Sequence, residues 1–215
     1  LLDYSLLSTL AYEARDITNA TLDTWFQDTN VINHEFIVEE FREEYEKQNS
    51  KSSVSYKFIG FPDKSVGVVS VRGTLNLWDI MSDIQLWAGA FISQIARSFI
   101  PVGNILTPLF EFIVEIVAKL ESSSLEKVSF YKQTTAFLNH IKELNLYDEI
   151  YITGHSLGGG IAMISGVQTE TFAIAISGPN AKLSRNTFSP PLSEVDIDEY
   201  AFNVLPAGDI VPMID

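Results

Sequence analysis

The sequence predicts an α/β fold in which a doubly wound, mostly parallel β-sheet carries flanking helices. Apolar runs rich in β-branched residues alternate along the chain with segments of helical periodicity, which is typical of a parallel sheet. The 215 residues, 46% hydrophobic and 20% charged, are enough for one globular domain with a sizeable core. We therefore expect a single domain over residues 1–215.

The N-terminal third predicts two helices and a hairpin. Apolar residues recur at helical spacing over residues 4–17 and again over 35–48, where the many acids form a solvated face. Alternation over 54–61 predicts an edge strand, 62–64 a turn and 65–72 a buried strand.

The C-terminal half predicts the alternation of helices and strands. A long helix is expected over 124–146, and strands over 149–153, 172–177 and 199–205. Residues 180–198, which include two adjacent prolines, are expected to form a loop.

An unusually apolar stretch occupies residues 86–120. Arg97 and Glu111 interrupt it, and no uncharged run reaches the ~18 residues of a transmembrane helix. Two interpretations stay open: one or two buried helices, or a mobile lid over 84–124 that meets lipid with its apolar face.

The charge and composition exclude several classes of partner. The formal net charge of −14 argues against nucleic acid and against docking on anionic lipid through a basic patch. The absence of cysteine excludes disulfides and thiolate metal sites, and three dispersed histidines argue against zinc. We expect no metal and no cofactor. The composition is compatible with a secreted or lumenal enzyme, and since the chain starts without a methionine we expect a removed leader or an internal start.

The most informative motif surrounds Ser156. A predicted strand precedes Gly154, a helix-compatible segment follows Gly158, and the serine stands between these glycines. A strand, a tight turn with a central serine and a helix form the nucleophile elbow of an α/β-hydrolase. The alternative is a glycine-rich loop with an incidental serine.

Further residues are expected to complete a serine-hydrolase site. The triad acid should follow a strand beyond the elbow, which selects Asp209, and the N–H of Leu157 should be one oxyanion donor. Thr74 follows an earlier buried strand and offers an N–H and a hydroxyl, which Asp83 could brace. Each also has an ordinary interpretation, as a turn residue or a helix-surface acid.

Three blocks of the sequence resemble the class 3 (fungal-type) lipases of the α/β-hydrolase fold. They are V-R-G-T at 71–74 with Asp83 downstream, I-T-G-H-S-L-G-G at 152–159 and G-D-I-V-P at 208–212. Val71 departs from the family, which usually has an aromatic residue there. The resemblance implies hydrolysis of lipid esters, of acylglycerols or phospholipids, at a lipid–water interface. It also favours a lid at 84–124.

The resemblance implies a role for each site residue. Ser156 is the expected nucleophile, Asp209 the triad acid and Thr74 part of the oxyanion hole. His155 belongs to the elbow motif and is expected to be structural.

The triad base has no credible candidate in this chain. It should follow Asp209, where no histidine occurs, and His34 and His140 fall in predicted helices with packing or surface roles. We consider three explanations: a C-terminal piece is missing and carries the base, a second chain supplies it, or the protein is a catalytically inactive binding or signalling module. Under the first two, this chain alone should show little or no esterase activity.

Overall fold

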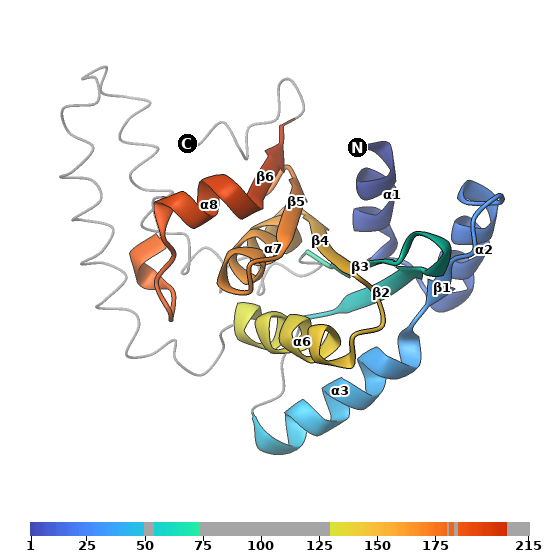
Figure 1. Cartoon of the computed structure of the whole chain (residues 1–215), viewed down its shortest axis with the longest axis horizontal. Coiled ribbons are helices and arrows are strands. Elements are labelled where there is room, and N and C mark those ends of the chain that lie inside the picture. The colour runs from blue at the N-terminus through green and yellow to red at the C-terminus, as the bar shows by residue number, and fades with distance from the viewer. Residues whose placement is uncertain (50–53, 74–129, 180, 183–184, 206–215) are drawn as a thin grey trace.

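The fold is built on one β-sheet. The computed structural model describes residues 1–49, 54–73, 130–179, 181–182 and 185–205 (Figure 1). Within these residues the strands lie in the sheet in their sequence order. They are β1 (Ile32–Asn33), β2 (Tyr56–Phe61), β3 (Val66–Val71), β4 (Glu149–His155), β5 (Phe172–Ile176) and β6 (Ala201–Val204).

The sheet is mixed, with parallel pairing in the part that carries the elbow. Strands β1, β2 and β3 pair antiparallel, and β2 and β3 are joined through the short 3-10 helix η1 (Pro62–Lys64). The pairs β3–β4, β4–β5 and β5–β6 are parallel. The carboxyl ends of β3 to β6 therefore meet at one edge of the sheet, as the predicted mostly parallel α/β fold requires.

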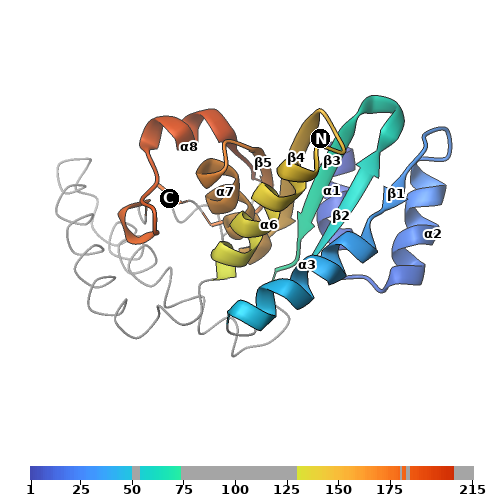
Figure 2. The same ribbon diagram turned by 60° about the horizontal axis from the view of Figure 1, so that its bottom comes forward.

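Helices cover both faces of the sheet (Figures 1 and 2). One face carries α1 (Leu2–Leu10) and α2 (Arg15–Trp25). The other face carries α3 (Glu35–Gln48), α6 (Phe130–Leu144), α7 (Leu157–Gln168) and α8 (Glu194–Tyr200), with the 3-10 helix η3 (Arg185–Thr187) before α8. No helix among the described residues is both long and apolar enough to cross a membrane.

Each face of the sheet has its own apolar core, because successive side chains of a strand point to opposite faces. In β2, Phe58 packs with Phe137 of α6 and with Ile152, whereas its neighbour Ile59 packs with Leu7 of α1. Leu7 is 2% exposed, and the other four of these side chains are fully buried. Burying each such side chain stabilises the fold by about 1.5–3 kcal/mol.

The predicted helix over 4–17 is wrong in one respect, since it is two helices. The chain leaves the helix after Leu10, and Ala14 is extended (φ −68°, ψ 162°) before α2 begins. Tertiary contacts hold this break: the Nζ of Lys57 in β2 donates to the carbonyl of Glu13 at 2.6 Å. An apolar spacing pattern alone does not reveal such a contact.

Two predictions about strands and loops are also corrected. The strand at 54–61 is not an edge strand, because the two-residue β1 pairs outside β2. The loop predicted at 180–198 contains most of α8, whose N-cap Ser193 accepts a hydrogen bond from the Asp196 N–H at 3.5 Å. Buried Ile197 anchors this short helix, which is too brief to show a periodic pattern.

The remaining predicted elements are confirmed where the structure describes them. The helix at 35–48 and the strands at 65–72, 149–153 and 172–177 correspond to α3, β3, β4 and β5. The strand predicted at 199–205 corresponds to β6, but it starts later than predicted because Glu199 and Tyr200 end α8. The predicted lid at 84–124 lies outside the described residues, as does the first part of the helix predicted at 124–146.

Candidate active site

Ser156 stands in the turn between β4 and α7 with a strained backbone. Its φ is 54° and its ψ is −127°, a conformation that residues with a Cβ adopt at a cost. Its N–H donates to the carbonyl of Ile176, the last residue of β5, at 3.0 Å, and its own carbonyl accepts from the Gly159 N–H at 2.9 Å. These backbone bonds hold the turn, so the strained conformation is built into the sheet edge.

The two glycines that flank Ser156 are required by close backbone contacts. A Cβ at Gly154 would lie 2.3 Å from the carbonyl oxygen of Gly158, and a Cβ at Gly158 would lie 2.4 Å from that of Val71. Both obstacles are main-chain atoms, which cannot rotate away as a side chain can. The helix therefore packs directly on the strand that precedes it and on the end of β3.

The turn presents hydrogen-bond donors beside the serine. Leu157 is the first residue of α7, and an N–H in the first turn of a helix has no intrahelical acceptor. The same end of the helix carries the positive end of its macrodipole. Leu157 is half-buried next to Ser156, so its N–H is suited to stabilise negative charge that develops on a bound carbonyl.

The end of β3 approaches the elbow from the neighbouring strand. Val71 is in register with Gly154, and the Gly158 amide nitrogen would lie only 3.3 Å from a Cβ at Gly73. Gly73, the last described residue after β3, therefore lies beside the turn that carries Ser156. Thr74 itself, together with Asp83 and Asp209, lies outside the described residues.

His155 ends β4 next to the serine, and its side chain is exposed. Its imidazole lies edge-on to the ring of Tyr12, with ring centroids 6.3 Å apart. Tyr12 could not be singled out from the sequence, because it falls between the apolar positions of the expected N-terminal helix. The break between α1 and α2 is what brings this tyrosine to the site.

His34 has a packing role away from the elbow. Its Nε2 lies 2.5 Å from the hydroxyl of Tyr147, and burial lowers the pKa of its imidazole. Tyr147 precedes β4 whereas Ser156 follows it, so the seven residues of this strand, about 20 Å, separate the two.

His140 lies on α6 against the ring of Phe41, with centroids 5.2 Å apart. Each of these two histidines therefore contacts an aromatic side chain, and of the two roles expected from the sequence, packing or surface, these contacts correspond to packing. Among the residues that the structure describes, no group of three or more His, Asp or Glu side chains could hold a metal ion.

The fold and the elbow together define the class of protein. A serine held in a strained turn between a parallel strand and a helix, at the carboxyl edge of the sheet, is the arrangement of an α/β-hydrolase. The model of the class 3 lipase family matches residues 68–214. The chain belongs to this family.

Solved structures of fungal lipases are similar to this chain at low identity. Lip2 lipase from Yarrowia lipolytica is 20% identical, with a TM-score of 0.37 over 74% of this chain and 55% of its own. A fungal lipase–inhibitor complex is 14% identical, with a TM-score of 0.46 over 97% of this chain and 71% of its own. Lipase II from Rhizopus niveus is 16% identical, with a TM-score of 0.43 over 98% and 73%.

The chain thus spans about half the length of the Yarrowia lipase. A comparison with curated proteins finds no match.

Proposed function

We propose that the protein hydrolyses carboxylic esters of lipids, acylglycerols or phospholipids, with Ser156 as its nucleophile. The observation that carries this proposal is the strained backbone of Ser156, φ 54° and ψ −127°, at the start of α7. Such strain is found most often at functional sites, and in a nucleophile elbow it would raise the serine hydroxyl above the sheet edge. Membership of a lipase family supports lipid esters as the substrate class.

The proposed reaction is acyl transfer through a covalent intermediate. The Ser156 Oγ attacks the ester carbonyl carbon while a histidine accepts its proton, and the N–H groups of Leu157 and Thr74 stabilise the oxyanion. The histidine then donates the proton to the leaving alcohol, and Asp209 orients the imidazole. A water molecule, deprotonated by the same histidine, releases the fatty acid. Asp83 would brace the Thr74 hydroxyl.

The histidine of this triad is proposed to come from outside the 215 residues, from a further C-terminal segment or from a second chain. The packing partners of His34 and His140 support this, as does the edge-on contact of His155 with Tyr12. Without its base, a triad enzyme retains only about 10³–10⁴-fold acceleration over water. The 215-residue chain alone should therefore turn over short p-nitrophenyl esters very slowly, and full turnover would contradict the missing-base argument.

Residues 84–124 are proposed as the lid of this site. Their apolar character suits a segment that covers the serine in water and opens at a lipid–water interface. Deleting this segment should remove any rise in activity as substrate passes from monomers to aggregates.

The test of the nucleophile is labelling of the longest native form with an active-serine phosphonate. We expect the wild-type protein and Ser177→Ala to react, and Ser156→Ala not to react. Ser177 is a matched control, because it also has a positive φ, 53°, and follows the neighbouring strand β5. Labelling that survives in Ser156→Ala would refute the proposed nucleophile.

The second candidate function is a non-catalytic binding or signalling module on the same fold. The contacts of His34 with Tyr147 and of His140 with Phe41 favour it, because both imidazoles are engaged in packing. A native form that fails to react with the phosphonate but still binds a lipid or protein partner would support the module and refute the enzyme.

A further inference from the structure

Tyr12 reaches the candidate active site from the far end of the sequence. It lies in the connection between α1 and α2, outside the segment 68–214 that matches the lipase family. Its hydroxyl accepts a hydrogen bond from the Gly73 N–H at 2.9 Å and donates to the His155 carbonyl at 3.4 Å. One side chain thereby bridges the residue that precedes Thr74 and the residue that precedes Ser156.

Tyr12 links the ends of β3 and β4 beyond the last residue pair of their parallel pairing. The pairing of β3 with β4 ends at Val71 and Gly154, so Gly73 and His155 lie beyond its last pair. Gly73 is buried, and its N–H would lose its acceptor without the tyrosine hydroxyl. The hydroxyl therefore extends the connection between the two strands by one further bridge, at the point where the backbone turns into the site.

The surroundings of the ring fix its position. The Arg72 guanidinium carbon lies 5.9 Å from the centre of the Tyr12 ring, and the His155 imidazole lies edge-on to it. A Cβ at Gly73 would come within 2.3 Å of the tyrosine oxygen. Because Gly73 has no Cβ, the Tyr12 hydroxyl can occupy the space beside its backbone.

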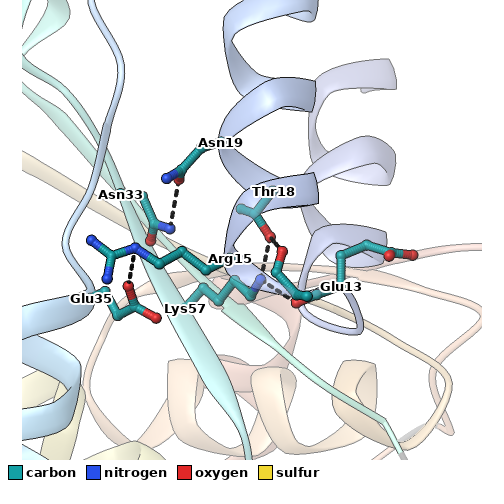
Figure 3. A network of polar contacts seen from close by, with 8 residues as sticks. Glu13, Arg15, Thr18, Asn19, Asn33, Glu35 and Lys57 are labelled. Atoms are coloured by element: carbon teal, nitrogen blue, oxygen red, sulfur yellow. Dashed lines mark hydrogen bonds and ion pairs between the residues drawn. The ribbon is translucent and has the colours of Figure 1, made fainter.

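The backbone that carries Tyr12 is itself anchored. Lys57 Nζ donates to the Glu13 carbonyl at 2.6 Å and also contacts the Thr18 hydroxyl, so β2 holds the connection between α1 and α2 (Figure 3). Nearby, the Arg15 guanidinium pairs with Glu35 at 2.7 Å. Burial raises the pKa of the Tyr12 phenol, so the hydroxyl keeps its proton at neutral pH and can donate and accept together.

We propose that Tyr12 is a positioning residue for ester hydrolysis, which holds the Gly73 peptide at a fixed distance from the Ser156 turn. This inference rests on the proposed function, since it assigns Tyr12 a part in the reaction of Ser156. A displacement of about 1 Å in a catalytic site can reduce the rate as much as 100-fold. Loss of the bridge is therefore expected to slow the attack of the serine without abolishing binding.

The test compares Tyr12→Phe with Tyr131→Phe in the longest native form. Tyr131 is a matched control, because its hydroxyl also accepts from a backbone N–H, that of Ser189, at 2.9 Å, and its residue is 5% exposed. The rate constant of phosphonylation at saturating probe, the probe concentration for half-maximal rate and the melting temperature are measured for each variant. Tyr12→Phe should lower the rate constant by about tenfold or more with little change in the half-maximal concentration.

Tyr131→Phe should lower the melting temperature to a similar extent and leave the rate constant near that of the wild type. Equal rate constants in the two variants would overturn the role of Tyr12 while leaving the proposed function intact. A wild-type protein that does not react at all would overturn both.

Discussion

Replacing Ser156, the proposed nucleophile, by glycine should make the protein more stable than replacing it by alanine. Ser156 is held at φ 54° and ψ −127°, and its side chain makes no capping bond at the start of α7. Such a conformation costs a residue with a Cβ about 1–3 kcal/mol, whereas glycine adopts it freely. Glycine loses about 0.5–1 kcal/mol more than alanine through chain entropy on folding. The net gain of Ser156→Gly over Ser156→Ala is therefore about 0–2.5 kcal/mol, with a midpoint near 1 kcal/mol.

The alanine variant is the proper reference, since both substitutions remove the hydroxyl and only glycine removes the Cβ. In a chain of this size, about 2–4 °C of melting temperature correspond to 1 kcal/mol, so at the midpoint of that range Ser156→Gly should melt roughly 2–4 °C above Ser156→Ala. Urea unfolding at equilibrium gives the same difference as a free energy. If Ser156→Gly were no more stable than Ser156→Ala, the turn would not store strain, and the main argument for Ser156 as the nucleophile would fail.

Two further predictions concern the elbow glycine Gly158 and the half-buried His34. Gly158→Ala should abolish phosphonylation of Ser156, because the new Cβ must move about 1 Å away from the Val71 carbonyl and displaces the turn. Gly67→Ala is the control, since its Cβ would meet only side chains. This control should lose about 1–3 kcal/mol of stability and still react with the phosphonate. Burial lowers the pKa of His34, so the unfolded chain binds more protons below about pH 6.5 and stability falls as the pH drops through that window. His34→Gln should lose less stability between about pH 7 and pH 5, and an equal loss would contradict this coupling.

The order of helices and strands was predictable wherever the chain carries a long periodic pattern. The α3 helix and the strands β3, β4 and β5 were found because several apolar residues recur within each of these segments of the sequence. The two-residue β1 and the short α8 were missed because neither is long enough to show a period. The spacing of Ser193 and Asp196 is a local signal for the start of α8, since the serine caps the helix. The two prolines just before it are instead typical of a loop.

The residues of the candidate site also fall into two groups, those that a local motif reveals and those that depend on distant contacts. Ser156 and Leu157 were identified from a local motif, since the strand, turn and helix that hold them are contiguous in sequence. Tyr12 was not, because its role depends on Gly73 and His155, residues 61 and 143 positions away. No property of the Tyr12 neighbourhood in the sequence indicates these contacts.

The sequence alone established the class of fold, the family and the elbow serine, because the turn around Ser156 needs glycines at fixed neighbouring positions and such a constraint is visible in the chain order. It also established that no histidine follows Asp209 in this chain. Only the tertiary structure decided that the N-terminal helix breaks after Leu10 and directs Tyr12 to the elbow. The reason is physical: a hydrogen bond between residues far apart in sequence leaves no periodic trace in either segment, and it exists only once the sheet has brought the strand ends together.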